Sequence, residues 1–244
     1  MKPLRVTIWN EYLGDRGKRG RSGKLYPGGM HEHLKQALAA PDLEIRTAWL
    51  GKDLNHGLSS SVLKNTDVLL WWGHGAHGLV RDKVADRVVE RVHEGMGFIP
   101  LHSSHMAKPF RRLMGTPCTL RWRENNDKCV LWNVSPNHPI TQGVPLHFTL
   151  EREEMYGERF DIPQPDELIF LSWFEGGNVF RGGCTFTRGA GRIFYFHPGH
   201  ETHPSFHDEN VLRVIGNAIR WAAPPEPRDF QPNAKMKPII DKQG

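Results

Sequence analysis

The chain has 244 residues, enough to bury a large core without crosslinks, and its three cysteines are odd in number and lack metal-ligand spacing. Its formal net charge is +5, but residues 1–29 alone hold seven basic and two acidic side chains, so the body of the chain is close to neutral. This uneven charge argues against a nucleic-acid partner, and no apolar run approaches the roughly 20 residues that cross a bilayer, so we expect a cytoplasmic protein without a membrane partner.

The first half of the chain alternates strand-like and helix-like segments. Apolar runs predict strands at 4–10, 43–50, 66–72 and 97–101, and helical patterns predict helices at 30–40, 59–65, 83–95 and 106–115. Within 83–95, Val84, Val88 and Val92 recur at every fourth position, as on one face of a helix. The alternation is typical of a parallel sheet with helices on both faces. A Gly- and Arg-rich segment, 11–29, interrupts it and is predicted to be a basic loop insertion.

The second half changes rhythm. Strand-like segments follow one another at 119–124, 128–134, 146–151, 167–177, 179–188 and 192–199, separated by Asn-Asp, Gly-Gly and Gly-Ala-Gly turns. We expect some to extend the sheet and others to form hairpins over its end. An amphipathic helix at 209–223 closes a single α/β domain spanning 1–223, and 224–244 is a Pro-rich C-terminal tail.

Histidines gather where the predicted strands of the parallel sheet end. His74 follows the strand at 66–72, His102 and His105 follow 97–101, and His200 follows the last strand. Ligands of open parallel sheets bind beyond these carboxyl ends. Imidazole titrates near neutrality and is a common zinc ligand, so acid/base work or metal ligation is one interpretation. The other is that each ring is hydrogen-bonded to a loop carbonyl.

Two further segments supply candidates. Strand alternation in 150–160 places Glu154 and Tyr156 on one face, where they could reach the histidines as acid/base partner or anionic ligand, or simply be solvated. Trp173 beside Glu175 suits a sugar ring, whose apolar face stacks on an aromatic while its hydroxyls are hydrogen-bonded; core packing explains the tryptophan equally well.

Taken together, several motifs make the chain similar to the ThuA-like (trehalose utilisation) family over residues 4–223. They are YPGGMHEHL, WWGHGAHG, LHSSHMAKPF, REEMYGE, WFEGGNVFRGGCTFTRGAGRIFYF and PGHETHP. The resemblance implies a class I glutamine amidotransferase-like fold, which is flavodoxin-like and doubly wound with a mainly parallel sheet, here with extra β-hairpins in the C-terminal half. It also implies use of trehalose and related sugars, with a sugar oxidoreductase of the same pathway as a partner. We further expect a homo-oligomer.

The same resemblance explains the turn after 97–101. Amidotransferases of this class carry a G-x-C-x-G turn followed by a histidine, and the cysteine position falls on His102 and the trailing histidine on His105. Pro100 and Ser104 replace the glycines. The catalytic histidine of the amidotransferases corresponds to His197 or His200 in FHPGHE. Without the cysteine nucleophile, glutamine hydrolysis is not expected.

The first hypothesis is an enzyme that acts on a disaccharide or an oxidised (keto) sugar by metal-assisted or His/Glu acid–base chemistry. The expected catalytic residues are His102, His200, Glu154, Ser103 and His105; the expected substrate contacts are His74, Tyr156, Trp173, Glu175 and His197. A divalent metal, zinc first, would be held by His31, His102 and His200, and no nucleotide cofactor is expected. The alternative is a non-catalytic sugar-binding accessory or regulatory protein. Residual hydrolysis through Ser103 ranks last, because no G-x-S-x-G frame surrounds it.

Overall fold

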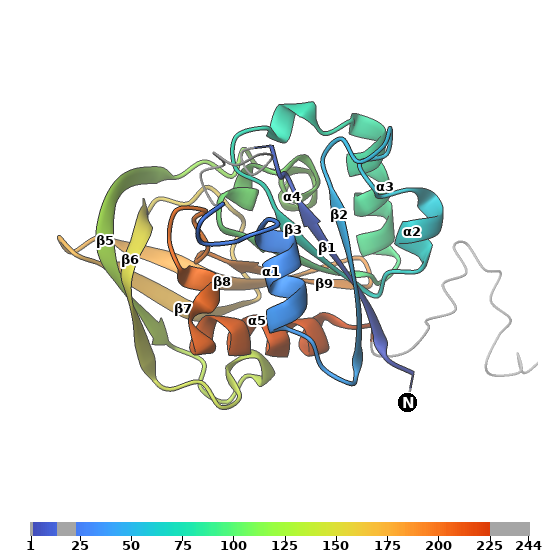
Figure 1. Ribbon diagram of the computed structural model, residues 1–244. Helices are drawn as coiled ribbons and strands as arrows, with labels where there is room; N and C mark the ends of the chain where they lie inside the picture. The colour runs from blue at the N-terminus through green and yellow to red at the C-terminus, as the bar shows by residue number, and fades with distance from the viewer. Residues whose placement is uncertain (1, 14–22, 225–244) are drawn as a thin grey trace, which may run out of the picture.

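In the computed structural model, which describes residues 2–13 and 23–224, the strands form one mixed sheet of nine (Figure 1). The centre of the predicted basic loop, 14–22, and the Pro-rich tail from 225 onward lie outside the described residues. No helix among the described residues is both long enough and apolar enough to cross a bilayer.

The elements keep the chain order that the sequence predicts. The strands are β1 (Leu4–Asn10), β2 (Leu43–Trp49), β3 (Val68–Trp72), β4 (Gly97–Leu101), β5 (Arg121–Asn133), β6 (His147–Gly157), β7 (Glu167–Phe174), β8 (Val179–Arg188) and β9 (Gly191–Phe196). The helices are α1 (Met30–Ala37), α2 (Ser60–Lys64), α3 (Asp82–His93), α4 (Lys108–Met114) and α5 (Glu209–Ala222).

The sheet has a parallel half and an antiparallel half. Its strand order is β2-β1-β3-β4-β9-β8-β7-β5-β6. The first five of these strands are parallel to one another, and every pairing from β9 onward is antiparallel. This confirms the α/β class with a doubly wound parallel part and added hairpins. The parallel strands β3 and β4 are buried along their whole length, as expected for strands covered by helices on both faces.

Helices cover both faces of the parallel half. Helix α1 packs on β1 and β2, and α5 packs on β4 and β9 at the same face, since Leu38 at the end of α1 lies beside Gly216 of α5. Helix α3 contacts α2, α4 and β9, and the three form the other layer. Valines at the predicted four-residue spacing give α3 its buried stripe.

One predicted turn is wrong. The segments 119–124 and 128–134 were expected to be separate strands, but the structure joins them in the single strand β5. Asn126, in the expected Asn-Asp turn, does adopt a left-handed conformation with φ of 56°. The pairing of β5 with β6 shifts register on both sides of Asp127, so the irregularity is a β-bulge that bends the strand without reversing it.

The start of β4 tests how tightly this core is packed. A Cβ added at Gly97 would lie 2.5 Å from the carbonyl oxygen of Ala222 in α5, and 2.8 Å from its Cβ. We expect Gly97→Ala to lower the free energy of unfolding by about 1–3 kcal/mol, because backbone must move to make room. Urea unfolding measures this. Gly78→Ala is the control, since a Cβ there meets nothing within 4 Å; equal stability of the two variants would contradict the packing described.

Candidate functional site

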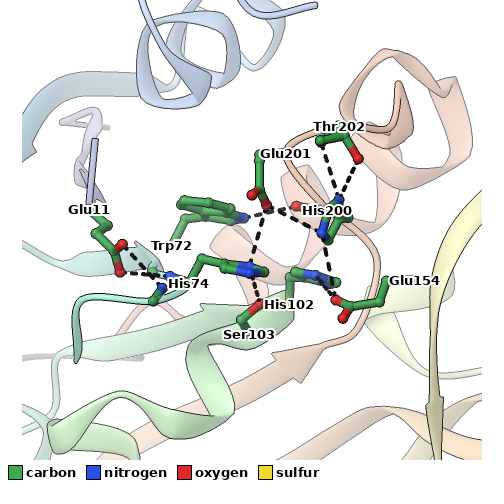
Figure 2. Close-up of polar contacts among 12 residues, drawn as sticks. Glu11, Trp72, His74, His102, Ser103, Glu154, His200, Glu201 and Thr202 are labelled. Atoms are coloured by element: carbon green, nitrogen blue, oxygen red, sulfur yellow. Dashed lines mark hydrogen bonds and ion pairs between the residues drawn. The ribbon is translucent and has the colours of Figure 1, made fainter. Parts of the chain in front are cut away.

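The candidate site lies where the parallel strands end (Figure 2). The segment after β1 supplies Glu11, the loop after β3 supplies His74, and the turn after β4 supplies His102. The loop after β9 supplies His200. The end of a parallel sheet is the usual ligand position of such folds, and the sequence predicted this convergence.

His102 begins a 3-10 turn (His102–Met106) directly after β4. Its φ of 52° lies in the left-handed region, which is strained for a non-glycine residue. This backbone conformation directs the side chain into the site. Its ring Nδ1 donates to the carbonyl oxygen of His197 at 2.9 Å. In the neutral ring, Nε2 is therefore the atom with the lone pair.

Nε2 of His102 faces a carboxyl group. Oε2 of Glu154, from β6, lies 2.9 Å away, and both side chains are almost completely buried. Burial, reinforced by the nearby His74, lowers the pKa of His102 well below its usual value. Burial raises the pKa of Glu154 to about 7, although His74 and the Tyr156 hydroxyl act in the opposite direction. The pair is therefore a neutral imidazole that faces a carboxyl group, and few hydrogen-bond donors surround that carboxyl group.

A chain of hydroxyl contacts connects β6 to the β3 loop. The Tyr156 hydroxyl donates to Oγ of Ser103 at 3.0 Å and lies 3.4 Å from His102 Nε2. Oγ of Ser103 lies 2.9 Å from Nδ1 of His74. Glu11 fixes this loop, because its carboxylate accepts the backbone N–H groups of His74 and Gly75 at 2.8 and 3.2 Å.

His200 enters from the loop after β9. Its Nε2 lies 3.6 Å from Oε2 of Glu201 and 3.9 Å from Oε2 of Glu154, while Oγ1 of Thr202 lies 2.8 Å from its Nδ1. Oε2 of Glu201 is also 3.3 Å from Nδ1 of His74. One nitrogen each from His74, His102 and His200 thus lies within 4.8 Å of the others, a grouping that could hold a metal ion.

A fully buried carboxyl group, Glu153, holds the His200 loop against β6. It accepts the backbone N–H groups of Gly199 and His200 at 2.9 and 3.3 Å, and the hydroxyl of Ser205 at 2.5 Å. Burial raises the pKa of Glu153 to about 7, although these donors oppose the shift. Adjacent residues of β6 therefore have separate tasks: Glu153 fixes the loop and Glu154 faces the histidines.

Of the predicted site residues, the structure brings together His102, His200, Glu154, Ser103, His74 and Tyr156. His31, the predicted third metal ligand, lies with its Nδ1 3.0 Å from Asn10 and its ring against Tyr12 and Trp49, and His74 takes its place in the three-histidine group.

Two other predicted histidines lie behind the site. His105 donates to the carbonyl oxygen of Cys118 and packs edge-on to Tyr156, and burial lowers its pKa to about 4. His197 is fully buried; its Nε2 donates to the backbone oxygen of Glu154 at 2.9 Å. They support the side chains that reach the pocket.

Two residues expected to contact sugar lie elsewhere. The ring of Phe174 packs against His197, so its strand neighbour Trp173 points to the opposite face of β7, where it is 40% exposed. Glu175 is in the β7–β8 turn beside the backbone N–H of Lys128.

The prediction of site residues missed three carboxylates. Glu11 directly follows β1 and Glu201 lies in the loop after β9, so position alone could have identified them. Glu124, whose Oε1 lies 3.8 Å from Nε2 of His200, gave no such signal because it precedes the bulge of β5.

Comparisons with known proteins agree with this architecture. The sequence model of the ThuA family, described as trehalose utilisation, matches residues 27–222. No curated protein matches the chain.

Solved structures resemble the chain at low identity. A ThuA-like protein from Parabacteroides merdae is 16% identical, with a TM-score of 0.67 over 95% of this chain and 94% of that one. A cytoplasmic protein from Salmonella typhimurium is 12% identical, with a TM-score of 0.62 over 91% of this chain and all of that one. PurLQS from Thermotoga maritima is 13% identical, with a TM-score of 0.53 over 91% of this chain and 99% of that one. These similarities show a ThuA-like, glutamine amidotransferase-like fold.

Glu153 gives a direct test of how the site is held. Glu153→Gln replaces one accepting oxygen by an NH2 group that faces a donor, so we expect unfolding free energy to fall by about 1–3 kcal/mol. Glu151→Gln on the same strand, where the side chain is 76% exposed, is the matched control and should change little. Chemical denaturation of both variants decides; an unaffected Glu153→Gln protein would mean that the carboxylate does not fix the loop.

Proposed function

The chain belongs to the ThuA (trehalose utilisation) family, and on that premise we propose that it is a sugar-utilisation enzyme which moves protons on a disaccharide or a keto sugar through Glu154 and the histidines around it. The observation that supports this most is the contact of 2.9 Å between Oε2 of Glu154 and Nε2 of His102. A carboxyl group and an imidazole at this distance exchange a proton readily, which is the requirement for general acid–base work.

A keto sugar suits such a pocket well. A C–H bond beside a carbonyl is far more acidic than other C–H bonds of a sugar, so a carboxylate can remove that proton while a nearby N–H group stabilises the oxygen. The Nε2 atom of His200 is 3.9 Å from Glu154 and is placed for that second task. A keto sugar arises by oxidation of a hydroxyl group, so a sugar oxidoreductase must supply it. We place the reaction in the cytoplasm, where the similar Salmonella protein is named as residing.

An aromatic side chain at the edge of the site suits the sugar ring. Trp122 is paired with Tyr156 across β5 and β6, so both side chains point to the same face of the hairpin. Tyr156 reaches His102, while Trp122 is 64% exposed. Two residues further along β5, Glu124 approaches His200. Trp122 is therefore the tryptophan we assign to stacking on substrate, in place of Trp173.

The proposal is tested by turnover. Glu154→Gln and His102→Ala should each reduce conversion of 3-keto-trehalose, or of trehalose, by at least about 100-fold, the usual contribution of a general acid or base. Mass spectrometry of the sugar products measures this, with Glu151→Gln as the control. Full activity in either variant would refute the assigned roles. A wild-type protein that binds these sugars and leaves them unchanged would indicate the accessory protein instead.

Two of the exposed tryptophans, Trp122 and Trp173, make a matched pair for substrate binding. Trp122→Ala should raise the KM for the sugar roughly 10-fold, since an exposed aromatic–ligand contact is worth about 1 kcal/mol or more, whereas Trp173→Ala should leave it unchanged. Steady-state kinetics of the two variants measures the difference. If Trp173→Ala raised the KM and Trp122→Ala did not, the sugar would instead contact Trp173 on the opposite face of the sheet.

A further inference from the structure

The three-histidine group at the end of the parallel sheet has the composition of a metal centre. We propose that His74, His102 and His200 together bind one divalent transition-metal ion, with the carboxyl group of Glu154 beside it. This deepens the proposed function and rests on it for the role of the ion, although not for its binding. The ligand set differs from the one that the sequence predicted, because His74 replaces His31.

His102 and Glu154 turn two electron-rich atoms toward each other. Nδ1 of His102 uses its proton on the carbonyl oxygen of His197, so its Nε2 presents a lone pair to Glu154. Oε2 of Glu154 accepts no hydrogen bond from the described residues, although its side chain is only 6% exposed. Two lone pairs 2.9 Å apart repel each other unless a proton or a cation lies between them. A proton on Glu154 fills this place in the metal-free pocket, and a metal cation would satisfy both atoms at once.

The three rings are close enough together to share one ion. Ligand nitrogens no more than 4.8 Å apart surround a point that lies at most about 2.8 Å from each, against zinc–nitrogen distances of about 2.0–2.1 Å. Each ring therefore has to move inward by less than about 1 Å to bind an ion. Such a movement is small for side chains on loops.

Hydrogen bonds behind the rings of His102 and His200 hold them in place. Metal-binding histidines use their second ring nitrogen to donate to a carbonyl or another oxygen, which fixes the ring and the lone pair. His102 does so to the backbone of His197. For His200, the Thr202 backbone N–H donates to Nδ1 at 3.2 Å in the metal-free protein. An ion on Nε2 requires the other tautomer, in which the Nδ1–H group donates to Oγ1 of Thr202 at 2.8 Å.

The chemistry of the ligands limits the ion. Three imidazoles suit zinc and also iron, copper or nickel, whereas magnesium and calcium prefer oxygen. His102 and His200 are buried, but the side chain of His74 is 31% exposed, so the group is reached from solvent on that side. Three protein ligands leave a fourth position open, as in catalytic zinc sites. A bound ion would replace the Nε2–H group of His200 in polarising a sugar oxygen, and Glu154 would remain beside it as the base.

Binding is tested without any sugar. Wild-type protein is treated with chelator, and Zn²⁺ and Co²⁺ are titrated into it by calorimetry and visible absorption, with elemental analysis of the reloaded protein. We expect one ion per chain and a Co²⁺ spectrum of low coordination number. His74→Gln and His200→Gln should weaken binding at least 100-fold, and Thr202→Val roughly 10-fold, as for a residue that orients a ligand.

His31→Gln is the matched control and should bind the ion as the wild type does. Circular dichroism of the metal-free variants checks that each is folded; where His74→Gln is not, His74→Asn replaces it. Absence of stoichiometric binding to the wild-type protein would overturn the proposal. So would binding that survives loss of both His74 and His200, or binding that depends on His31.

The result is separable from the proposed function. If turnover depends on Glu154 in a protein free of metal, the acid–base proposal stands and the ion has no role in the reaction. If the three histidines bind an ion but the protein converts no sugar, the metal site stands and the acid–base proposal is refuted.

Discussion

The site depends on one contact, between the unprotonated Nε2 of the His102 ring and the buried carboxyl group of Glu154. Three parts of the chain must cooperate to produce it. The left-handed turn at His102 points the ring into the pocket, the carbonyl oxygen of His197 accepts the hydrogen bond from Nδ1–H, and β6 brings Glu154 to Nε2. Because His197 in turn donates to the backbone of Glu154, the same residue orients both members of the pair. A change in any of the three would separate them.

This arrangement explains the division of the sheet into two halves. The loops after the parallel strands bring together histidines that are far apart in the sequence. Such loops form the ligand site in open α/β folds. The loops after the parallel strands also supply two buried carboxylates, Glu11 and Glu201. The antiparallel half adds two more: β6 supplies Glu154, with Tyr156, to the pocket, and Glu153 to the loop that holds His200. The amidotransferase-like fold thus carries a group of histidines and carboxyl groups at the ends of its parallel strands.

Much of the fold was predictable because it follows from local pattern. The four-residue spacing of its valines predicts α3, and continuous apolar runs predict β3 and β4, so each element follows from its own residues. The convergence of His74, His102 and His200 followed from strand ends, and strand alternation paired Glu154 with Tyr156. Failures arose where long-range packing decides. Nothing local distinguishes His31 from His74, the bulge at Asp127 resembles a turn, and the exposed tryptophan nearest the site emerges only from the register of β5 with β6.

The central claim concerns one nitrogen atom, and long-range ¹H–¹⁵N correlation spectra of the histidine rings observe it directly. In chelator-treated protein at neutral pH, the account predicts that the His102 ring is neutral, with its proton on Nδ1 and none on Nε2, as donation to the His197 carbonyl requires. A proton on Nε2, or on both nitrogens, would mean that the lone pair does not face Glu154, and it would contradict the account.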